Sequence, residues 1–330
     1  MQQTNRSRHR HITSFQVISL GFLSAILLGS LFLMLPIATK SGQCTSFLDA
    51  LFTATSAVCV TGLVVNDTAT YWSLFGQGVI LLLIQIGGMG IITIAIAIAV
   101  VSGRKIGLMQ RSTMQEAISA PTVGGIVRRT QFIIRTTILI EIIGAVLLAP
   151  VFCRDFGFWK GIWYSLFHSI SAFCNAGFDL IGIRTPFSSL TSYSVQPIVN
   201  LVIMMLIIAG GIGFLTWEDI KNRKWHFKKY RMQSKVIFMV TGILIFLPAL
   251  YFFYFEFSNV PLTERVWVSL FQSVTPRTAG FNTADLTLLS EVGQMLIIVL
   301  MLIGGSPGST AGGMKTTTLA VLVSSALSVF

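Results

Sequence analysis

The chain has 330 residues, of which 53% are hydrophobic and 11% are charged. Because soluble proteins carry about 25% charged residues, this composition excludes a soluble globular protein and indicates one embedded in a lipid bilayer. The formal net charge is +11. No soluble domain is left over that would bind nucleic acid, so we expect the basic residues to mark one side of the membrane.

Five apolar runs are long enough to cross a bilayer, which takes about 20 residues. In chain order they are residues 15–37, 75–101, 130–152, 195–216 and 234–257. The first run is too long for a signal-peptide core of about 7–15 residues, so we expect it to remain as an anchor. A last apolar region, residues 292–330, is interrupted by glycine and proline over 304–313, which predicts a broken helix.

Three shorter apolar stretches lie between these spans, over residues 47–57, 162–172 and 265–274. Each would form about 15–17 Å of helix, which is half a membrane thickness. One such stretch would be interpreted as a surface helix, but three in matching places predict re-entrant half-helices.

The basic residues predict the orientation of the chain. Sixteen of the 23 Lys and Arg residues lie near the N-terminus, in the links 102–129 and 217–233, or directly beside these links. The positive-inside rule therefore predicts that the N-terminus and both links are cytoplasmic. The half-helices would then enter from the outer face of the plasma membrane. A docking surface for a cytosolic partner is the alternative interpretation of the basic links.

An internal repeat organises these segments. The pattern Ser-Ala-x-Cys-x-x-Gly ends at Gly62 and again at Gly177, and a weaker copy ends at Gly280. Each copy follows a half-helix and precedes a glycine cluster in the next span. The repeat unit is therefore a span, a half-helix, a glycine-bearing loop and a second span. It occupies residues 1–101, 130–216 and 234–330, with the glycine loops at 58–63, 173–178 and 275–282.

This unit has a physical interpretation. A half-helix that enters from outside directs the negative end of its dipole towards the middle of the membrane, which favours a cation there. The backbone carbonyls of the following loop can replace the hydration shell of that cation, and glycine permits the required conformations. The three loops contain no carboxylate, and Asp179 is the nearest acid to the second loop. The pattern predicts a carbonyl-lined cation filter.

Four motifs resemble the Ktr/Trk potassium-uptake superfamily, most closely the membrane subunit of Ktr systems. They are Ser-Ala-Val-Cys-Val-Thr-Gly-Leu, His-Ser-Ile-Ser-Ala-Phe-Cys-Asn-Ala-Gly-Phe, Val-Thr-Pro-Arg-Thr-Ala-Gly-Phe-Asn and Gly-Ser-Thr-Ala-Gly-Gly-Met-Lys-Thr. The resemblance covers essentially the whole chain. It implies an all-α polytopic membrane protein with tandem M1–pore-helix–M2 repeats, built like potassium channels around one potassium pathway. It also implies a homodimer and a cytosolic RCK-type nucleotide-binding regulatory ring.

The resemblance further assigns residues to a filter and to a gate. The filter glycines correspond to Gly62, Gly177 and Gly280, and glycine in the first loop implies selectivity for potassium. The full set expected to line the filter is Cys59, Val60, Thr61, Gly62, Cys174, Asn175, Ala176, Gly177, Arg277, Thr278, Ala279 and Gly280. The set expected to form an intramembrane gating loop is Gly304, Gly305, Ser306, Pro307, Gly308, Ser309, Thr310, Ala311, Gly312, Gly313 and Lys315. The ligand is transported K⁺, with Na⁺ as a candidate coupling ion and no covalently bound cofactor.

Several alternatives follow from the same residues. The family has four repeats and three are found here, so the alternative to a potassium transporter is a truncated, non-conducting fragment or a subunit whose pore a second polypeptide completes. Lys315 would repel cations in the closed gate or extend to the cytoplasmic interface. Arg277 is expected to pair behind the filter with Asp285 or Glu291. An intramembrane serine hydrolase that uses Ser306 and a histidine is the less favoured reading, and no enzyme activity is expected.

Overall fold

The computed structural model describes residues 13–90, 93–94, 107–117, 124–224 and 226–329. Within them the chain is helical, and β-pairing is limited to isolated bridges at Thr39–Trp72 and Ile303–Met314. The helices are α1 (Ser14–Met34), α2 (Phe47–Val58), α3 (Thr68–Tyr71), α4 (Leu74–Met89), α6 (Leu108–Ala117), α7 (Ile126–Phe156), α8 (Phe158–Phe173), α9 (Pro197–Gly211), α10 (Phe214–Arg223), α11 (Met232–Tyr251), α12 (Leu262–Val274), α13 (Glu291–Leu302) and α14 (Thr316–Val329). Short 3-10 turns and a π-helical turn, Phe252–Glu256, complete the list.

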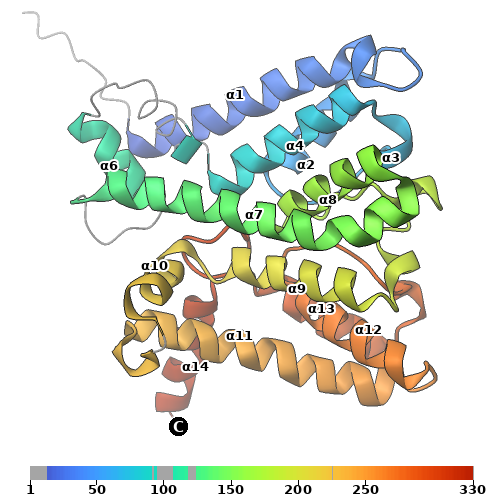
Figure 1. Cartoon of the computed structure of the whole chain (residues 1–330). Coiled ribbons are helices and arrows are strands. Elements are labelled where there is room, and N and C mark those ends of the chain that lie inside the picture. The colour runs from blue at the N-terminus through green and yellow to red at the C-terminus, as the bar shows by residue number, and fades with distance from the viewer. Residues whose placement is uncertain (1–12, 91–92, 95–106, 118–123, 225, 330) are drawn as a thin grey trace, which may run out of the picture.

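Three helical segments are long and apolar enough to cross a membrane: Ser14–Met34, Ile126–Phe156 and Met232–Glu256. They correspond to α1, α7 and α11 with its π-helical turn, and α1 begins with a capping box formed by Thr13 and Gln16. In Figure 1 these three helices extend in similar directions, with α6, α10 and α14 gathered towards one end of them. The segments that we expect to be cytoplasmic therefore share one end of the molecule.

The second span of the second repeat is not the single helix expected over residues 195–216. Helix α9 ends at Gly211 and α10 begins at Phe214, and their axes differ by 97°. Gly213, between them, has φ +86°, which a helix cannot contain. In the first repeat, α4 ends at Met89 before Gly90 (φ +79°). Residues 91–92 and 95–101 of that expected span lie outside the described residues, as do residues 102–106 and 118–123 of the first link.

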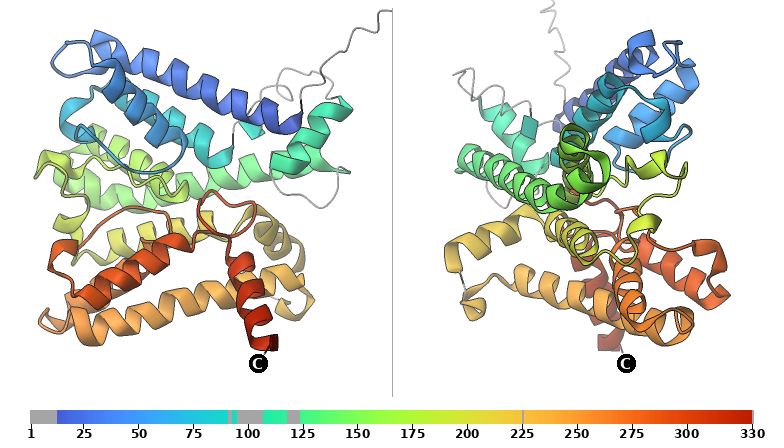
Figure 2. Two further views of the ribbon diagram at one scale, coloured as in Figure 1. Left: turned by 180° about the vertical axis from the view of Figure 1, so that it is seen from behind. Right: turned by 45° about the vertical axis from the view of Figure 1, so that its right-hand side comes forward.

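The third repeat is interrupted where glycine and proline predicted it. Helix α13 ends at Leu302 and α14 begins at Thr316, with a loop between them. Figure 2 shows this loop arching inwards between the two helices. All three repeats thus have a second span that stops or bends at its glycine cluster.

The half-helices are α2, α8 and α12, and two of them begin earlier than the sequence predicted. Helix α8 starts at Phe158 and α12 at Leu262. Helix α8 follows α7 after a single residue, Gly157, and packs back along it so closely that a Cβ on Gly161 would lie 2.4 Å from the Cα of Cys153. The small residue at 161 therefore permits this tight helical hairpin.

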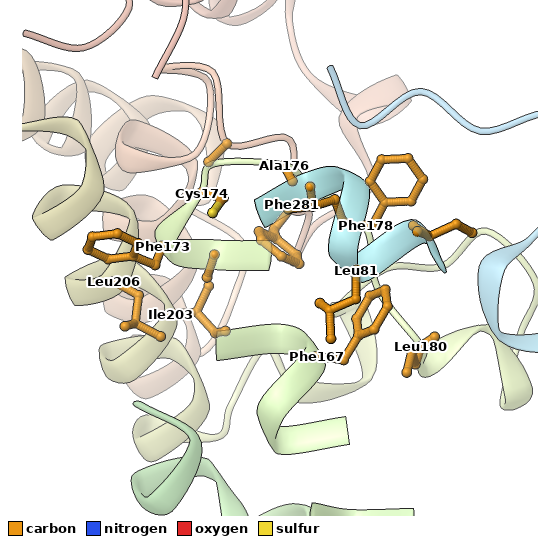
Figure 3. Close-up of a cluster of buried hydrophobic side chains, with 14 of the residues drawn as sticks. Leu81, Phe167, Phe173, Cys174, Ala176, Phe178, Leu180, Ile203, Leu206 and Phe281 are labelled. Carbon is orange, nitrogen blue, oxygen red and sulfur yellow. The ribbon is translucent and has the colours of Figure 1, made fainter. Parts of the chain in front are cut away.

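The core surrounds the C-terminal end of α8. Figure 3 shows Phe167, Phe173 and Phe178 of the second repeat packed with Leu81 of α4 and Phe281 of the third repeat. These side chains are buried. Three repeats therefore share one core, and the second glycine loop lies within it.

Candidate functional site

The three glycine loops have the same backbone conformation. In each loop the filter glycine has a positive φ: +79° at Gly62, +71° at Gly177 and +81° at Gly280. The residue two positions earlier also has a positive φ, in the order Val60 (56°), Asn175 (57°) and Thr278 (68°). Non-glycine residues seldom adopt this conformation, so its recurrence in all three loops indicates one shared structural unit.

Each loop is fastened to the end of its own half-helix. The amide nitrogen before each glycine donates a hydrogen bond to a carbonyl in the last turn: Thr61 to Ser56 (2.8 Å), Ala176 to Ser171 (2.8 Å) and Ala279 to Thr275 (3.0 Å). These three backbone amides are therefore hydrogen-bonded to the half-helices. The carbonyl oxygens of the loop residues remain available to a ligand.

Side-chain hydroxyls add a second anchor in two of the loops. Ser171 Oγ donates to the carbonyl of Phe178 at 2.7 Å, and Thr275 Oγ1 donates to the carbonyl of Phe281 at 2.6 Å. The residue in the matching position of the first loop, Ser56, is buried and its hydroxyl has no partner among the described residues. Ser56 and Ser171 belong to the repeated motif, but the motif alone did not predict a role for these hydroxyls.

The three loops meet edge to edge. A Cβ added to Gly62 would lie 2.6 Å from the carbonyl oxygen of Ala176, and one added to Gly177 would lie 2.6 Å from the carbonyl oxygen of Ala279. A Cβ on Gly280 would lie 3.5 Å from the Cα of Gly177. The filter residues expected from the sequence are thus brought together. Both conformation and space require glycine at positions 62 and 177, and conformation favours it at position 280.

The chemistry of this arrangement is that of a neutral carbonyl cage. The C-terminal ends of α2, α8 and α12 lead directly into it, so the helix dipoles add negative potential. Among the described residues no group of three or more His, Cys, Asp or Glu side chains is placed to hold a metal. Asp179 is turned to its own loop, where its Oδ1 accepts from the Ile181 amide at 3.0 Å. The cage is therefore suited to a weakly held monovalent cation.

The two cysteines in the loops, both expected among the residues that line the filter, differ in their surroundings. Cys174 is buried and Cys59 is exposed. Cys174 Sγ lies 3.6 Å from Gln85 Oε1, and the Gln85 amide donates to both carboxylate oxygens of Glu141 at 3.0 and 3.1 Å. Cys174, Gln85 and Glu141 therefore form a polar cluster behind the second loop. The sequence did not predict this cluster because its residues are far apart in the chain.

Arg277 does not make the ion pair that the sequence led us to expect. Its side chain is buried at 7% exposure, and its Nε has no hydrogen-bond partner among the described residues. Asp285 instead accepts from Thr287 within its own turn, and Glu291 lies in the first turn of α13. Among the ion pairs of the described residues neither acid contacts Arg277, so the expectation for Arg277 is wrong.

The loop between α13 and α14 rests on the bend between α9 and α10. The Ser306 amide donates to the carbonyl of Gly211 at 2.8 Å, and the Phe214 amide donates to the carbonyl of Gly308 at 2.8 Å. A Cβ on Gly213 would lie 2.6 Å from the carbonyl oxygen of Pro307. The loop 304–313 of the third repeat therefore packs on the bend between α9 and α10 in the second repeat.

One side chain connects this loop to the second filter loop. Thr310 Oγ1 donates to the carbonyl of Phe173 at 2.8 Å and accepts from Asn175 Nδ2 at 3.0 Å. The Thr310 amide donates to the carbonyl of Gly210 at 3.2 Å. The loop is thus bonded to the end of α8, which carries the filter residues Cys174–Gly177.

Lys315 and Ser306 have local partners within or beside this loop. Lys315 Nζ donates to the carbonyl of Ala311 at 2.8 Å, so the ammonium group folds against the loop. The Ser306 hydroxyl shares a hydrogen bond of 3.0 Å with the hydroxyl of Thr316. The His168 ring is buried and bonded to backbone groups of its own repeat. Among the described residues Ser306 does not pair with a histidine, so the hydrolase hypothesis has no geometric support.

Comparison with known proteins agrees with this architecture. The family described as "TrkH: Cation transport protein" matches residues 2–330. The potassium/sodium uptake protein NtpJ of Enterococcus hirae is 42% identical over 320 residues, which are 95% of this chain and 69% of that protein. The Ktr system potassium uptake protein B of Bacillus subtilis is 43% identical over 319 residues, which are 94% of this chain and 70% of that protein.

A solved structure has the same fold. The crystal structure of the potassium transporter TrkH from Vibrio parahaemolyticus superimposes with a TM-score of 0.71 at 22% sequence identity. The match covers 97% of this chain and 62% of that chain. The fold is therefore that of a polytopic, all-α membrane protein.

Proposed function

The chain belongs to the family of TrkH cation transport proteins, and from this premise we propose that it conducts potassium into the cell through a filter made by its glycine loops. The family is one of transporters and not of enzymes. The named relatives are potassium uptake proteins, which favours K⁺ among the monovalent cations. The relatives are longer than this chain, so the proposal concerns the pathway to which these three repeats contribute.

The observation that carries the proposal is the convergence of three loops with one backbone conformation at the ends of three half-helices. Carbonyl oxygens in such a ring can replace the hydration shell of K⁺ without a carboxylate. A neutral cage also releases the ion readily, which conduction requires. Cys59–Gly62, Cys174–Gly177 and Arg277–Gly280 are the proposed filter residues, with the backbone of Arg277 facing the filter and its side chain behind it.

We propose the loop 304–313 as the gate below this filter. Its hydrogen bonds to Phe173 and Asn175 hold it against the second wall of the pathway. Lys315 would place a positive charge beside it, and that charge opposes the passage of cations while the loop is closed. Release of the loop from the α9–α10 bend would open the route.

The proposed assembly is a homodimer that binds a cytosolic RCK-type nucleotide-binding ring. The relatives called Ktr system proteins support a partner, since their names describe a system with other components. The plasma membrane with a cytoplasmic N-terminus is the proposed location, because the basic links share one end of the helices. Sodium coupling is proposed on the relative named for potassium and sodium.

Growth of potassium-uptake-deficient cells at low potassium tests the function. We expect the chain to restore growth, and both Gly62→Ser and Gly62→Ala to lose that rescue, because either residue brings a Cβ within 2.6 Å of the Ala176 carbonyl oxygen at a positive φ. Gly42→Ala is the matched control, because Gly42 also has a positive φ (+71°) but nothing within 4 Å of an added Cβ. Equal uptake by the Gly62 and Gly42 variants would refute the filter. If the chain alone is inactive, rescue by coexpression with a longer relative whose own uptake has been abolished would identify a partner-completed pore. Inactivity in both arms would support a non-conducting fragment.

A further inference from the structure

A basic recess lies at the cytoplasmic end of the second repeat, between α7 and α10. It encloses about 580 Å³ and includes Arg128, Arg135, Trp217 and Lys221 in its lining. Arg128 and Arg135 are exposed, and neither makes an ion pair within the part of the chain that the structure describes. Lys221 Nζ lies 4.7 Å from the centre of the Phe132 ring, with no carboxylate partner among the described residues. Three cations therefore face one recess without a neutralising side chain.

The nearest acid is already engaged elsewhere. Glu218 contacts Arg129 at 3.4 Å and Arg231 at 2.9 Å. Glu218 lines the adjoining recess with Arg128 and Lys221, but its single negative charge is already shared by its contacts with Arg129 and Arg231. The recess keeps a positive potential that attracts an anion.

An apolar groove continues from this recess towards the middle of the membrane. It encloses about 460 Å³ between α7, α9 and α11, and its lining consists of Ile, Leu, Val, Met, Phe, Trp, Gly and Ala residues. Trp217 and Ile220 line both the recess and the groove. Trp217 Nε1 donates to the carbonyl of Ala209 at 2.9 Å, which fixes the indole at the junction. Tryptophan favours this boundary between headgroups and hydrocarbon.

We propose that an anionic phospholipid binds here, with its phosphate-bearing headgroup at Arg128, Arg135 and Lys221 and one acyl chain in the apolar groove. The dimensions agree. Arg135, the arginine of the recess nearer the groove, and Leu147, at the far end of the groove, are twelve residues apart along α7, about 18 Å of helix. Half of a bilayer core is about 15 Å, so the groove reaches from the cytoplasmic headgroup layer to the midplane.

Charge and shape together favour this occupant. A free phosphate would use the recess but leave the groove empty, and a neutral lipid would leave three cations without an anion. A second copy of this chain would bring the same cations against each other, which is unfavourable. Basic pockets between helices on the cytoplasmic side are suited to anionic headgroups, and each Lys or Arg near the surface adds about fivefold in affinity.

The site adjoins the structure that holds the proposed gate. Trp217 and Ile220 are in α10, and the first residue of α10, Phe214, donates its amide to the carbonyl of Gly308. A lipid between α7 and α10 would therefore fix the bend on which the loop 304–313 rests. Binding itself does not depend on potassium transport, so its failure and the failure of the proposed function are distinguishable.

Native mass spectrometry of the purified chain tests the proposal with three probes: phosphatidylglycerol, phosphatidylcholine with the same acyl chains, and inorganic phosphate. We expect phosphatidylglycerol to bind at least tenfold more tightly than phosphatidylcholine. The double variant Arg135→Gln, Lys221→Gln should lose about 25-fold in affinity for phosphatidylglycerol. Lys228→Gln, in the same cytoplasmic link, and Arg154→Gln, at the opposite end of α7, should bind like the parent.

A second variant separates the groove from the charges. Met205 is 58% exposed and lines the groove, so Met205→Trp should fill the groove and weaken phosphatidylglycerol binding while all three cations remain. Equal binding of both lipids, or equal losses in the Lys228 and Arg154 variants, would overturn the proposal. So would full displacement of the lipid by inorganic phosphate, or dimerisation through this face that excludes lipid.

Discussion

Substitution of Thr310 by valine tests whether the loop 304–313 is held closed by its bonds to the second filter loop. Valine has nearly the shape of threonine but lacks the hydroxyl, so the backbone can stay in place. The change removes the donor to the Phe173 carbonyl (2.8 Å) and the acceptor for Asn175 Nδ2 (3.0 Å). Both Thr310 and Asn175 are buried, so water does not readily replace either bond.

The magnitude follows from ordinary hydrogen-bond energies. Each lost bond contributes about 1 kcal/mol, and an Asn175 amide left unpaired in the closed state adds up to about 1 kcal/mol more. The closed position of the loop should therefore lose about 2–3 kcal/mol. That shifts the equilibrium between the closed and released loop by about 30- to 150-fold.

The assay is rubidium or potassium uptake into proteoliposomes that contain the chain without any cytosolic partner. We expect Thr310→Val to raise the basal uptake rate and Thr310→Ser, which keeps the hydroxyl, to restore the parent rate. Ser309→Ala is the matched control, because the Ser309 hydroxyl makes only a 3.4 Å contact with the carbonyl of Ala311. Unchanged uptake in a correctly folded Thr310→Val protein would refute the reasoning.

Two further predictions concern the α9–α10 bend, on which the loop 304–313 packs, and the basic link 217–233. Gly210→Ala should fail to fold or should unfold at a temperature well below that of the parent, because an added Cβ would lie 1.9 Å from the Phe173 carbonyl oxygen. Gly211→Ala, where an added Cβ meets nothing within 4 Å, should unfold at the parent temperature. Thermal unfolding in detergent distinguishes the two variants, and equal unfolding temperatures would contradict this packing. Asp219→Ala should lower the free energy of unfolding by about 2–3 kcal/mol, because the buried Asp219 carboxylate accepts from the Arg231 amide at 3.1 Å and from the Ser234 hydroxyl at 2.7 Å, whereas Arg231 keeps its ion pair with Glu218. Limited proteolysis of the link 217–233 would then be faster, and an unchanged cleavage rate would show that Asp219 does not hold it.

The sequence predicted the parts of this fold that repeat. The pattern ending at Gly62 and Gly177 located two of the three glycine loops, because a motif with a helix before it and glycine at its end has few structural solutions. The weaker copy at Gly280 was recognised by its spacing. Membership of the family is confirmed by the match over residues 2–330.

The sequence did not predict contacts between repeats. Asn175 and Thr310 are 135 positions apart, and Gln85 and Glu141 are 56 apart; no local pattern joins either pair. The bend after α9 was visible as the glycines at 210, 211 and 213. It was interpreted as part of a continuous span because glycine is common in membrane helices. A bend is distinguished from a glycine within a continuous helix only by the positive φ of Gly213 and by the contact of Gly213 with the loop 304–313.

The three loops have one backbone but different side chains at the earlier positive-φ position, and this difference explains why the gate contacts one wall. Val60, Asn175 and Thr278 occupy that position in turn. Asparagine adopts a positive φ more readily than a β-branched residue, and its amide is long enough to reach Thr310. Valine has no polar group to offer, and the Thr278 hydroxyl has no partner among the described residues. The repeats therefore share the backbone geometry of the proposed filter, while the single Asn175 makes the second repeat the one through which the loop 304–313 would influence that filter.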